Sequence, residues 1–298
     1  MRRRNFIKLS GAALAAPRLP WNTAATAAAD PMPIKKSLKY TMVEEKMPIV
    51  DQFRMLVDIG FDGVEMDSPS NVDTNEVLAA QKATGLEIPG VINSVHWKVP
   101  MSHPDPAVRA ECVEATKTAL RDCKAYGGTT VLLVPAVVND QVSYADAYRR
   151  SQAAIREVLP VAEETGVKIA IENVWNNFLL SPLEAARYVD ELESDKVGWY
   201  FDVGNVVRYG WPEHWINVLG DRIIKLDIKE YSRKKEQEEG TAKGFDVDLM
   251  AGDCNWPEVN KALTNIGYTG WASAEVPGGN RQRLEHISEK MDAIFGLG

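Results

Sequence analysis

The stretch VGWYFDVGNVVRYGWPEHWINVLGDRIIKLDIKEY (residues 197–231) decides which fold the sequence predicts. It contains two short, mostly apolar runs, and each run ends in an acid, the first at Asp202 and the second at Asp227. Apolar runs of about five residues with turn signals on both sides are typical of buried parallel strands. The segment between them, which opens at Trp211, has the length of one helix. The stretch therefore predicts two strands joined by a helix, with a carboxylate at the end of each strand.

The same pattern occurs on both sides of this stretch. VKIAI (residues 167–171) ends in Glu172, and WASA (residues 271–274) ends in Glu275. In α/β barrels the carboxyl ends of the strands meet at one face, so the four acids should converge there. Carboxylate oxygens suit hard divalent cations, and acids in one pocket repel each other unless a cation or protons compensate. We therefore predict a site for one divalent metal ion (Mn²⁺, Mg²⁺ or similar) with the ligands Glu172, Asp202, Asp227 and Glu275.

Strand and helix signals alternate along the chain from residue 37 onward. The count of about eight strand–helix units matches a parallel (β/α)8 barrel, which needs about 250 residues. An open doubly wound sheet is the alternative, but the first strand is not followed by a glycine-rich phosphate-binding turn. The prediction is one TIM-barrel domain over residues 30–298. A long charged loop (residues 232–254) follows the seventh strand, either as a solvated loop or as a lid or rim over the barrel mouth.

The N-terminus carries a different signal. RRNFIK (residues 3–8) matches the twin-arginine export pattern, a mildly apolar stretch follows, and small residues suited to cleavage lie near residues 25–29. We expect residues 1–29 to be an export signal and the mature protein to be periplasmic or otherwise exported. No run of 18 apolar residues exists, which predicts that the mature protein has no membrane span.

Charge limits the partners of this protein. The formal net charge is −8, and removal of residues 1–27 changes it to −13 because five cationic residues and no acid are lost. So acidic a protein is not expected to bind nucleic acid through a phosphate-neutralising surface, and its overall field also disfavours a sugar phosphate. The three cysteines form no Cys-x-x-Cys motif, which argues against a disulfide framework or a thiolate metal site.

Several motifs resemble the sugar isomerase/epimerase family with a xylose-isomerase-like TIM barrel, which includes ketose 3-epimerases and is related to endonuclease IV. The resemblance implies that Glu172, Asp202 and Glu275 bind one divalent metal ion, and that Glu172 and Glu275 also move the substrate proton. The motifs that carry it extend over most of residues 37–295 and are GFDGVEM (60–66), IAIENV (169–174), FDVGN (201–205), KLDIKEY (225–231), AGDCNWPEVNKAL (251–263) and GYTGWASAEV (267–276).

Two positions depart from that family. Asp227 stands where the family usually has a histidine ligand, and Asn205 stands where it usually has a histidine near the substrate. Asp227 as a ligand would give an all-carboxylate shell that favours Mg²⁺, Mn²⁺ or Ca²⁺ over softer metals. Alternatively, Asp227 only caps a turn or pairs with Lys229. The loss of both histidines also weakens a DNA-repair function, whose multi-zinc site depends on several histidines.

Further residues are expected at the barrel mouth as candidates for substrate binding. His96 and Trp97 follow the third strand, where an imidazole could bind a hydroxyl and an indole could stack on a sugar ring. A packing role is the alternative for each. The remaining candidates are Asn205, Lys229 and Glu65, together with Arg281, which could reach an anionic group.

These observations predict a divalent-metal-dependent sugar isomerase or epimerase that uses enediolate-type proton transfer. Its substrate would be a non-phosphorylated carbohydrate, since phosphorylated sugars are mainly cytoplasmic and this chain carries an export pattern. A keto-glycoside lyase or hydrolase on the same scaffold is the first alternative. A non-catalytic sugar-binding protein is the second. The sequence leaves open which sugar and carbon are involved, which metal binds and what the oligomeric state is.

Overall fold

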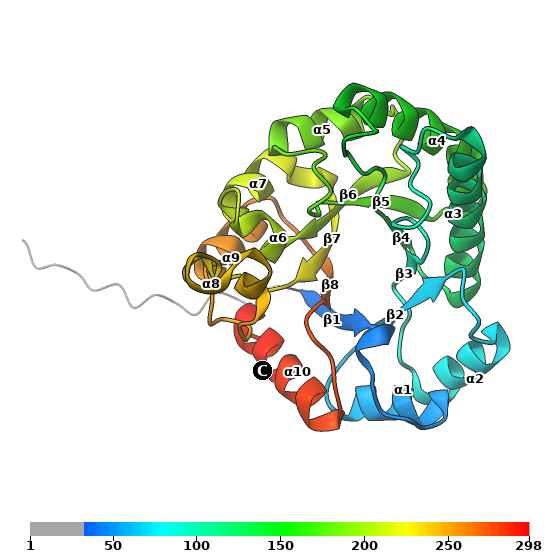
Figure 1. Cartoon of the computed structure of the whole chain (residues 1–298). Coiled ribbons are helices and arrows are strands. Elements are labelled where there is room, and N and C mark those ends of the chain that lie inside the picture. The colour runs from blue at the N-terminus through cyan, green and yellow to red at the C-terminus, as the bar shows by residue number, and fades with distance from the viewer. Residues whose placement is uncertain (1–32, 298) are drawn as a thin grey trace, which may run out of the picture. The chain divides into compact units, whose positions relative to one another are not determined.

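The computed structural model describes residues 33–297, and they form a closed barrel of eight parallel strands (Figure 1). Each strand pairs with its neighbours in chain order, and β1 pairs with β8 to close the barrel. This closure confirms the predicted (β/α)8 barrel and rules out the open doubly wound sheet. The strands are β1 (Ile34–Lys39), β2 (Gly63–Ser68), β3 (Gly90–Asn93), β4 (Thr130–Leu133), β5 (Lys168–Glu172), β6 (Val197–Asp202), β7 (Ile223–Ile228) and β8 (Gly270–Ala274).

Helices surround the barrel as an outer ring (Figure 1). Capping side chains fix where some of these helices begin. Asp73 and Ser181 accept hydrogen bonds from amides in the first turns of α2 (Thr74–Thr84) and α5 (Pro182–Asp190). They are α1 (Ile49–Asp58), α2 (Thr74–Thr84), α3 (Pro106–Tyr126), α4 (Tyr144–Thr165), α5 (Pro182–Asp190), α6 (Val203–Val207), α7 (Pro212–Leu219), α8 (Arg233–Glu239), α9 (Trp256–Asn265) and α10 (Arg281–Phe295). No helix in residues 33–297 is long and apolar enough to cross a membrane.

The connection between β6 and β7 differs from its prediction. Two helices, α6 and α7, replace the single expected helix. Asp202 caps the additional helix, because its Oδ1 accepts a hydrogen bond from the Asn205 amide (2.8 Å) directly at the end of the strand. The acid at the tip of β6 therefore has a structural task in addition to its position at the barrel mouth.

The interior of the barrel is polar and charged. Glu65 on β2 contacts Lys225 on β7, and these strands are not neighbours, so the contact must cross the interior. Lys39 on β1 similarly contacts the hydroxyl of Tyr200 on β6 (3.1 Å). All four side chains are almost fully buried. The main apolar cluster is built from strand and helix residues, and a small separate cluster consists of Leu132, Ala170 and Tyr200 on β4, β5 and β6.

The segment after β7 (residues 232–254) is packed against the barrel. It contains α8 and a 3-10 turn, Thr241–Phe245. The buried carboxylate of Glu230 anchors its far end, accepting hydrogen bonds from the amides of Met250 (2.8 Å) and Cys254 (3.1 Å). At Gly244 a Cβ would lie 2.3 Å from the ring of Tyr231, so the turn and the ring are in close contact. Of the two predicted interpretations, a rim over the barrel mouth is the one that fits these contacts.

Candidate metal centre and binding cavity

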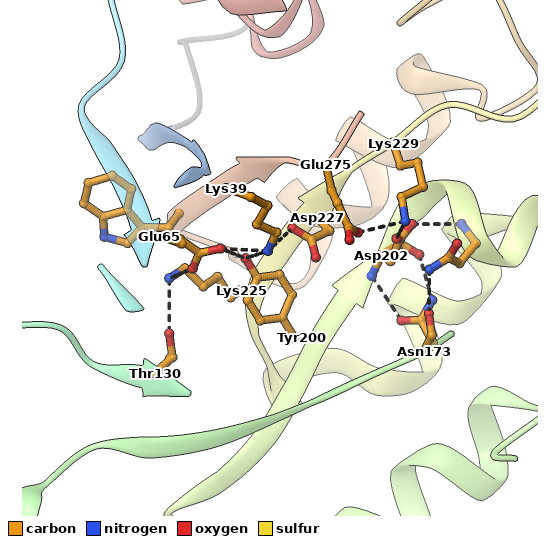
Figure 2. A network of polar contacts seen from close by, with 12 residues as sticks. Lys39, Glu65, Thr130, Asn173, Tyr200, Asp202, Lys225, Asp227, Lys229 and Glu275 are labelled. Atoms are coloured by element: carbon orange, nitrogen blue, oxygen red, sulfur yellow. Dashed lines mark hydrogen bonds and ion pairs between the residues drawn. The ribbon is translucent and has the colours of Figure 1, made fainter. Parts of the chain in front are cut away.

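The four acids predicted from the strand ends do converge. Each offers a carboxylate oxygen within 4.8 Å of the others, and Asp202, Asp227 and Glu275 lie together in Figure 2. The pairing of β6 with β7 places Asp202 directly beside Asp227. Glu275 follows β8, where its amide donates to the Ile228 carbonyl (3.1 Å), and Glu172 ends β5. Four consecutive strands therefore present one carboxylate each at a single point.

Lys229 lies within this cluster. Its Nζ is 2.9 Å from Asp202 Oδ2 and 2.8 Å from Glu275 Oε2 (Figure 2). Glu172, Asp202 and Glu275 with this single ammonium group have a formal excess of two negative charges. A divalent cation would compensate that excess.

Asp227 is held by a different lysine from the one considered in the sequence analysis. Lys39 Nζ is 2.7 Å from Asp227 Oδ1 and 2.7 Å from Glu65 Oε2 (Figure 2). Glu65 also pairs with Lys225. The two carboxylates and two ammonium groups of this interior network balance in formal charge. The alternative pairing of Asp227 with Lys229 is wrong, because Lys229 pairs with Asp202 and Glu275.

Burial and the nearby lysines shift the pKa values of these acids in opposite directions. It raises the pKa of Asp202 to about 6, although Lys229 acts in the opposite direction. Burial, followed by the charge of Glu275, raises the pKa of Glu172 well above its ordinary value. Burial alone would also raise the pKa of Glu275, but Lys229 and Lys39 outweigh it and lower that pKa. The cluster thus carries more negative charge than its buried position tolerates without a further cation or protons.

The residues present fit a metal ion. Four carboxylate oxygens are the donor set that hard divalent cations prefer. Asp202 Oδ2, Glu275 Oε2 and both carboxylate oxygens of Asp227 are buried and accept no hydrogen bond, although ammonium groups lie close to three of them. Asp227 Oδ2 is the one of these oxygens with neither a hydrogen bond nor an ammonium group beside it, so it is the oxygen that needs a cationic partner. Glu172, Asp202 and Glu275 would hold the ion, with Asp227 as a fourth ligand shared with Lys39.

Asn173 positions two residues of this site. Its Oδ1 accepts hydrogen bonds from the Asp202 amide (3.1 Å) and from Trp199 Nε1 (3.0 Å), and its Nδ2 donates to the Asp202 carbonyl (2.8 Å). Asn205 Nδ2 donates to the Asn173 carbonyl (3.0 Å), which fixes the side chain that replaces the family histidine. These contacts hold the end of β6 in place, and Asn173 was not among the predicted site residues.

The predicted substrate-binding residues separate into two groups. His96, Trp97, Asn205 and Lys229 line two adjoining cavities above the acids. Burial lowers the pKa of His96 to about 4, and its Nδ1 accepts a hydrogen bond from the Val134 amide (3.2 Å). The ring is therefore neutral near pH 7, with its proton on Nε2 and available to a substrate oxygen.

Two other predicted residues do not reach these cavities. Glu65 is 1% exposed and lies inside the barrel, where Lys39 and Lys225 hold its pKa well below the usual range despite burial. Arg281 lines a separate hollow beside α1, 3.7 Å from Asp58. Glu65 therefore contacts the lysines beneath the site and does not line the cavities. Arg281 is no longer a candidate for substrate binding, because α10 begins at this residue and directs its side chain toward α1.

Sequence comparison agrees with the geometry. The sequence model of the Xylose isomerase-like TIM barrel family matches residues 53–295. The chain belongs to this family. That match covers β2 to β8 and all four clustered acids.

Two relatives of this chain are epimerases by name. L-ribulose-5-phosphate 3-epimerase UlaE of Shigella flexneri is 25% identical over 191 residues, which cover 58% of this chain and 66% of the relative. The 2-epi-5-epi-valiolone 7-phosphate 2-epimerase of an Actinoplanes species is 26% identical over 172 residues, covering 55% and 60%. This chain therefore matches slightly less than two thirds of each relative. Among solved structures, 3-keto-D-glucoside 4-epimerase YcjR of E. coli shares the fold, with a TM-score of 0.74, 16% identity, and coverage of 88% and 98%.

Proposed function

We propose that this protein is a divalent-metal-dependent isomerase or epimerase of a non-phosphorylated sugar or sugar derivative. One observation carries the proposal: Glu172 and Glu275 belong to the acid cluster and also line both cavities. The same two carboxylates can therefore contact a bound ion and a bound substrate. Relatives that are epimerases by name support this choice of reaction.

The two glutamates would carry the proton. One removes it from the carbon between a carbonyl and a hydroxyl, and the other returns a proton to the resulting enediolate, at the same carbon for epimerisation or at its neighbour for isomerisation. When bound, a divalent ion would polarise the carbonyl and acidify that C–H bond. Lys229 holds Glu275 through its ion pair (2.8 Å), and His96 Nε2–H is placed to donate to a sugar oxygen.

The absence of a phosphate from the proposed substrate follows from the pairing of the lysines. Among the residues that line the two cavities, the cationic side chains are Lys39 and Lys229, and each is already paired with two carboxylates. A phosphate group would find no unpaired cationic side chain among these lining residues. The two curated relatives are named for phosphorylated substrates, so this chain would differ from them. The expected export signal lies outside the described residues, and we propose an exported location on the sequence pattern alone.

Metal content and proton exchange test this function together. We expect about one divalent ion per chain by mass spectrometry, lost in a Glu172→Ala/Asp202→Ala double variant. We also expect the metal-loaded protein to exchange a carbon-bound proton of a free ketose for deuterium in D₂O, measured by NMR. Metal binding without exchange on any free sugar or keto-glycoside would support the sugar-binding alternative. Exchange accompanied by loss of a substituent would support the lyase.

Lys229 should compete with the metal ion for the carboxylates. Its ammonium group contacts Asp202 and Glu275, so a Lys229→Met variant should bind Mn²⁺ at least tenfold more tightly in titration calorimetry, about 1.4 kcal/mol. Lys234→Met is the matched control, because that side chain is 81% exposed on α8 and should leave the affinity unchanged. Weaker binding in Lys229→Met would mean that the lysine supports the ion instead of competing with it.

A further inference from the structure

The cavity above the acids has two chambers that share one wall. The shared wall consists of Trp97, Glu172, Glu275 and Val276. One chamber has a volume of about 430 Å³ and the other about 410 Å³. Each alone falls in the range of about 300 to 1,000 Å³ that is typical of small-molecule sites. The two catalytic candidates therefore lie at a junction between two spaces, each of ligand size.

The chambers differ in chemistry. The aromatic chamber is lined on its own side by four apolar residues, Val174, Trp175, Phe245 and Pro277, and by the polar groups of Asn205, Lys229 and Glu230. The polar chamber is lined on its own side by groups that include Asp67, Asn93, Ser94 and His96. Hydroxyl groups of a sugar suit the second set, whereas the apolar face of a ring suits the first.

The aromatic chamber is held in shape by the packed rim. Phe245 stacks at an angle on Trp175 (ring centroids 4.7 Å apart) and lies edge-on to Tyr231 (4.8 Å). Trp175 Nε1 donates to the Asn205 carbonyl (2.9 Å), which ties the aromatic wall to α6. Trp97, which divides the chambers, is 52% exposed, an uncommon position for so large an apolar side chain without a partner. The aromatic surface is thus formed before any ligand arrives.

We propose that the substrate is a glycoside with two rings: a sugar in the polar chamber, and a second ring with an apolar face in the aromatic chamber. The linkage between them would pass Trp97, close to Glu172 and Glu275. A single monosaccharide would occupy one chamber and leave the other to water. This inference rests on the proposed function for its chemistry, but the binding it predicts does not require turnover. The second ring is either an aryl group or another sugar, since both present an apolar face.

Binding of unreactive glycosides tests the second chamber directly. Glucose, phenyl β-D-glucoside and cellobiose lack the keto group, and NMR of each mixture after the titration checks that the ligand is unchanged, so that titration calorimetry measures binding alone. At least one of the two glycosides should bind tenfold or more tightly than glucose. A preference for the phenyl glucoside would identify an aryl ring, and a preference for cellobiose a sugar ring. Equal affinity for all three ligands would overturn the proposal.

Variants in each chamber locate the effect. Val174→Phe should fill the aromatic chamber and reduce the affinity of the preferred glycoside at least tenfold, with glucose changed less than twofold. Phe245→Leu keeps apolar packing but removes the ring, and should reduce the same affinity severalfold, so it serves if Val174→Phe does not fold. Asp67→Asn in the polar chamber should reduce the affinities for all three ligands by a similar factor. Equal weakening of glucose and glycosides by Val174→Phe would also overturn the proposal.

Failure of this inference and failure of the proposed function remain distinguishable. Selective glycoside binding without deuterium exchange into a keto-glycoside would leave the two-chamber site standing and remove the epimerase. Exchange into a free ketose, combined with no preference for any glycoside, would do the reverse.

Discussion

Replacing Glu275 with glutamine is expected to reduce turnover at least about 10³-fold, within the range that one general acid or base contributes. The amide keeps the size of the side chain but cannot accept or deliver the substrate proton. Glu275 is also the one acid of the four in the cluster that is not buried, with 37% of its side chain exposed. The measurement is the rate of deuterium incorporation into the substrate that the wild-type protein turns over.

The substitution also removes a charge next to the metal site, so two controls are needed. Mn²⁺ is added to saturation and its occupancy measured before each assay, which separates lost proton transfer from lost metal. Glu258→Gln on α9 is the matched variant, because Glu258 is an exposed acid paired only with Lys261 and should leave the rate unchanged. Wild-type activity in metal-saturated Glu275→Gln would exclude Glu275 from proton transfer.

The convergence of the acids was predictable because it depends on local patterns. A short apolar run followed by an acid identifies a strand end, and parallel strands place their carboxyl ends together. The sequence alone therefore predicted that the carboxylates of Glu172, Asp202 and Glu275 lie close together, as they do in the structure. Asn205 and Lys229 followed the same rule and line the cavity.

The interior network could not be predicted in the same way. Lys39 contacts its register partner Glu65 on the neighbouring strand β2 and also Asp227 on β7, and the sequence near these residues does not specify these pairs. One feature of the sequence did indicate a buried ion pair. Lys225 is a charged residue within an otherwise apolar strand, and in a closed barrel such a residue needs a buried partner. The prediction for Arg281 was wrong for a local reason. Arg281 lies a few residues beyond Glu275, but α10 begins at Arg281 and directs its side chain toward Asp58.

Replacing Lys39 is also expected to destabilise the fold strongly. Its side chain is only 4% exposed, and its ammonium group contacts Glu65, Asp227 and the Tyr200 hydroxyl. Methionine would fill a similar volume but leave Glu65 with Lys225 alone and Asp227 without a cation. Breaking a buried ion pair by removing one partner costs about 3–5 kcal/mol. Urea denaturation of Lys39→Met should show a loss of that size in the free energy of unfolding.

The same strand supplies the control, because Lys35 forms an ion pair with Glu87 in which both side chains are about half exposed. Lys35→Met should cost no more than about 1 kcal/mol. Adding Asp227→Asn to Lys39→Met should recover part of the loss, because it removes the carboxylate left without a partner. Equal losses for Lys35→Met and Lys39→Met would mean that the interior network contributes little to stability.

The pH dependence of the loss distinguishes an unpaired charge from a packing defect. Lys225 and Lys39 lower the pKa of Glu65 despite its burial, so the stability that this carboxylate contributes is present above its unfolded-state pKa of about 4.3. It is lost as pH falls through the lower folded-state pKa. In Lys39→Met the buried carboxylates take up protons more readily. The difference in the free energy of unfolding between wild type and Lys39→Met should therefore be largest near pH 7 and should become smaller below about pH 4. A gap that stays constant across this range would assign the loss to packing.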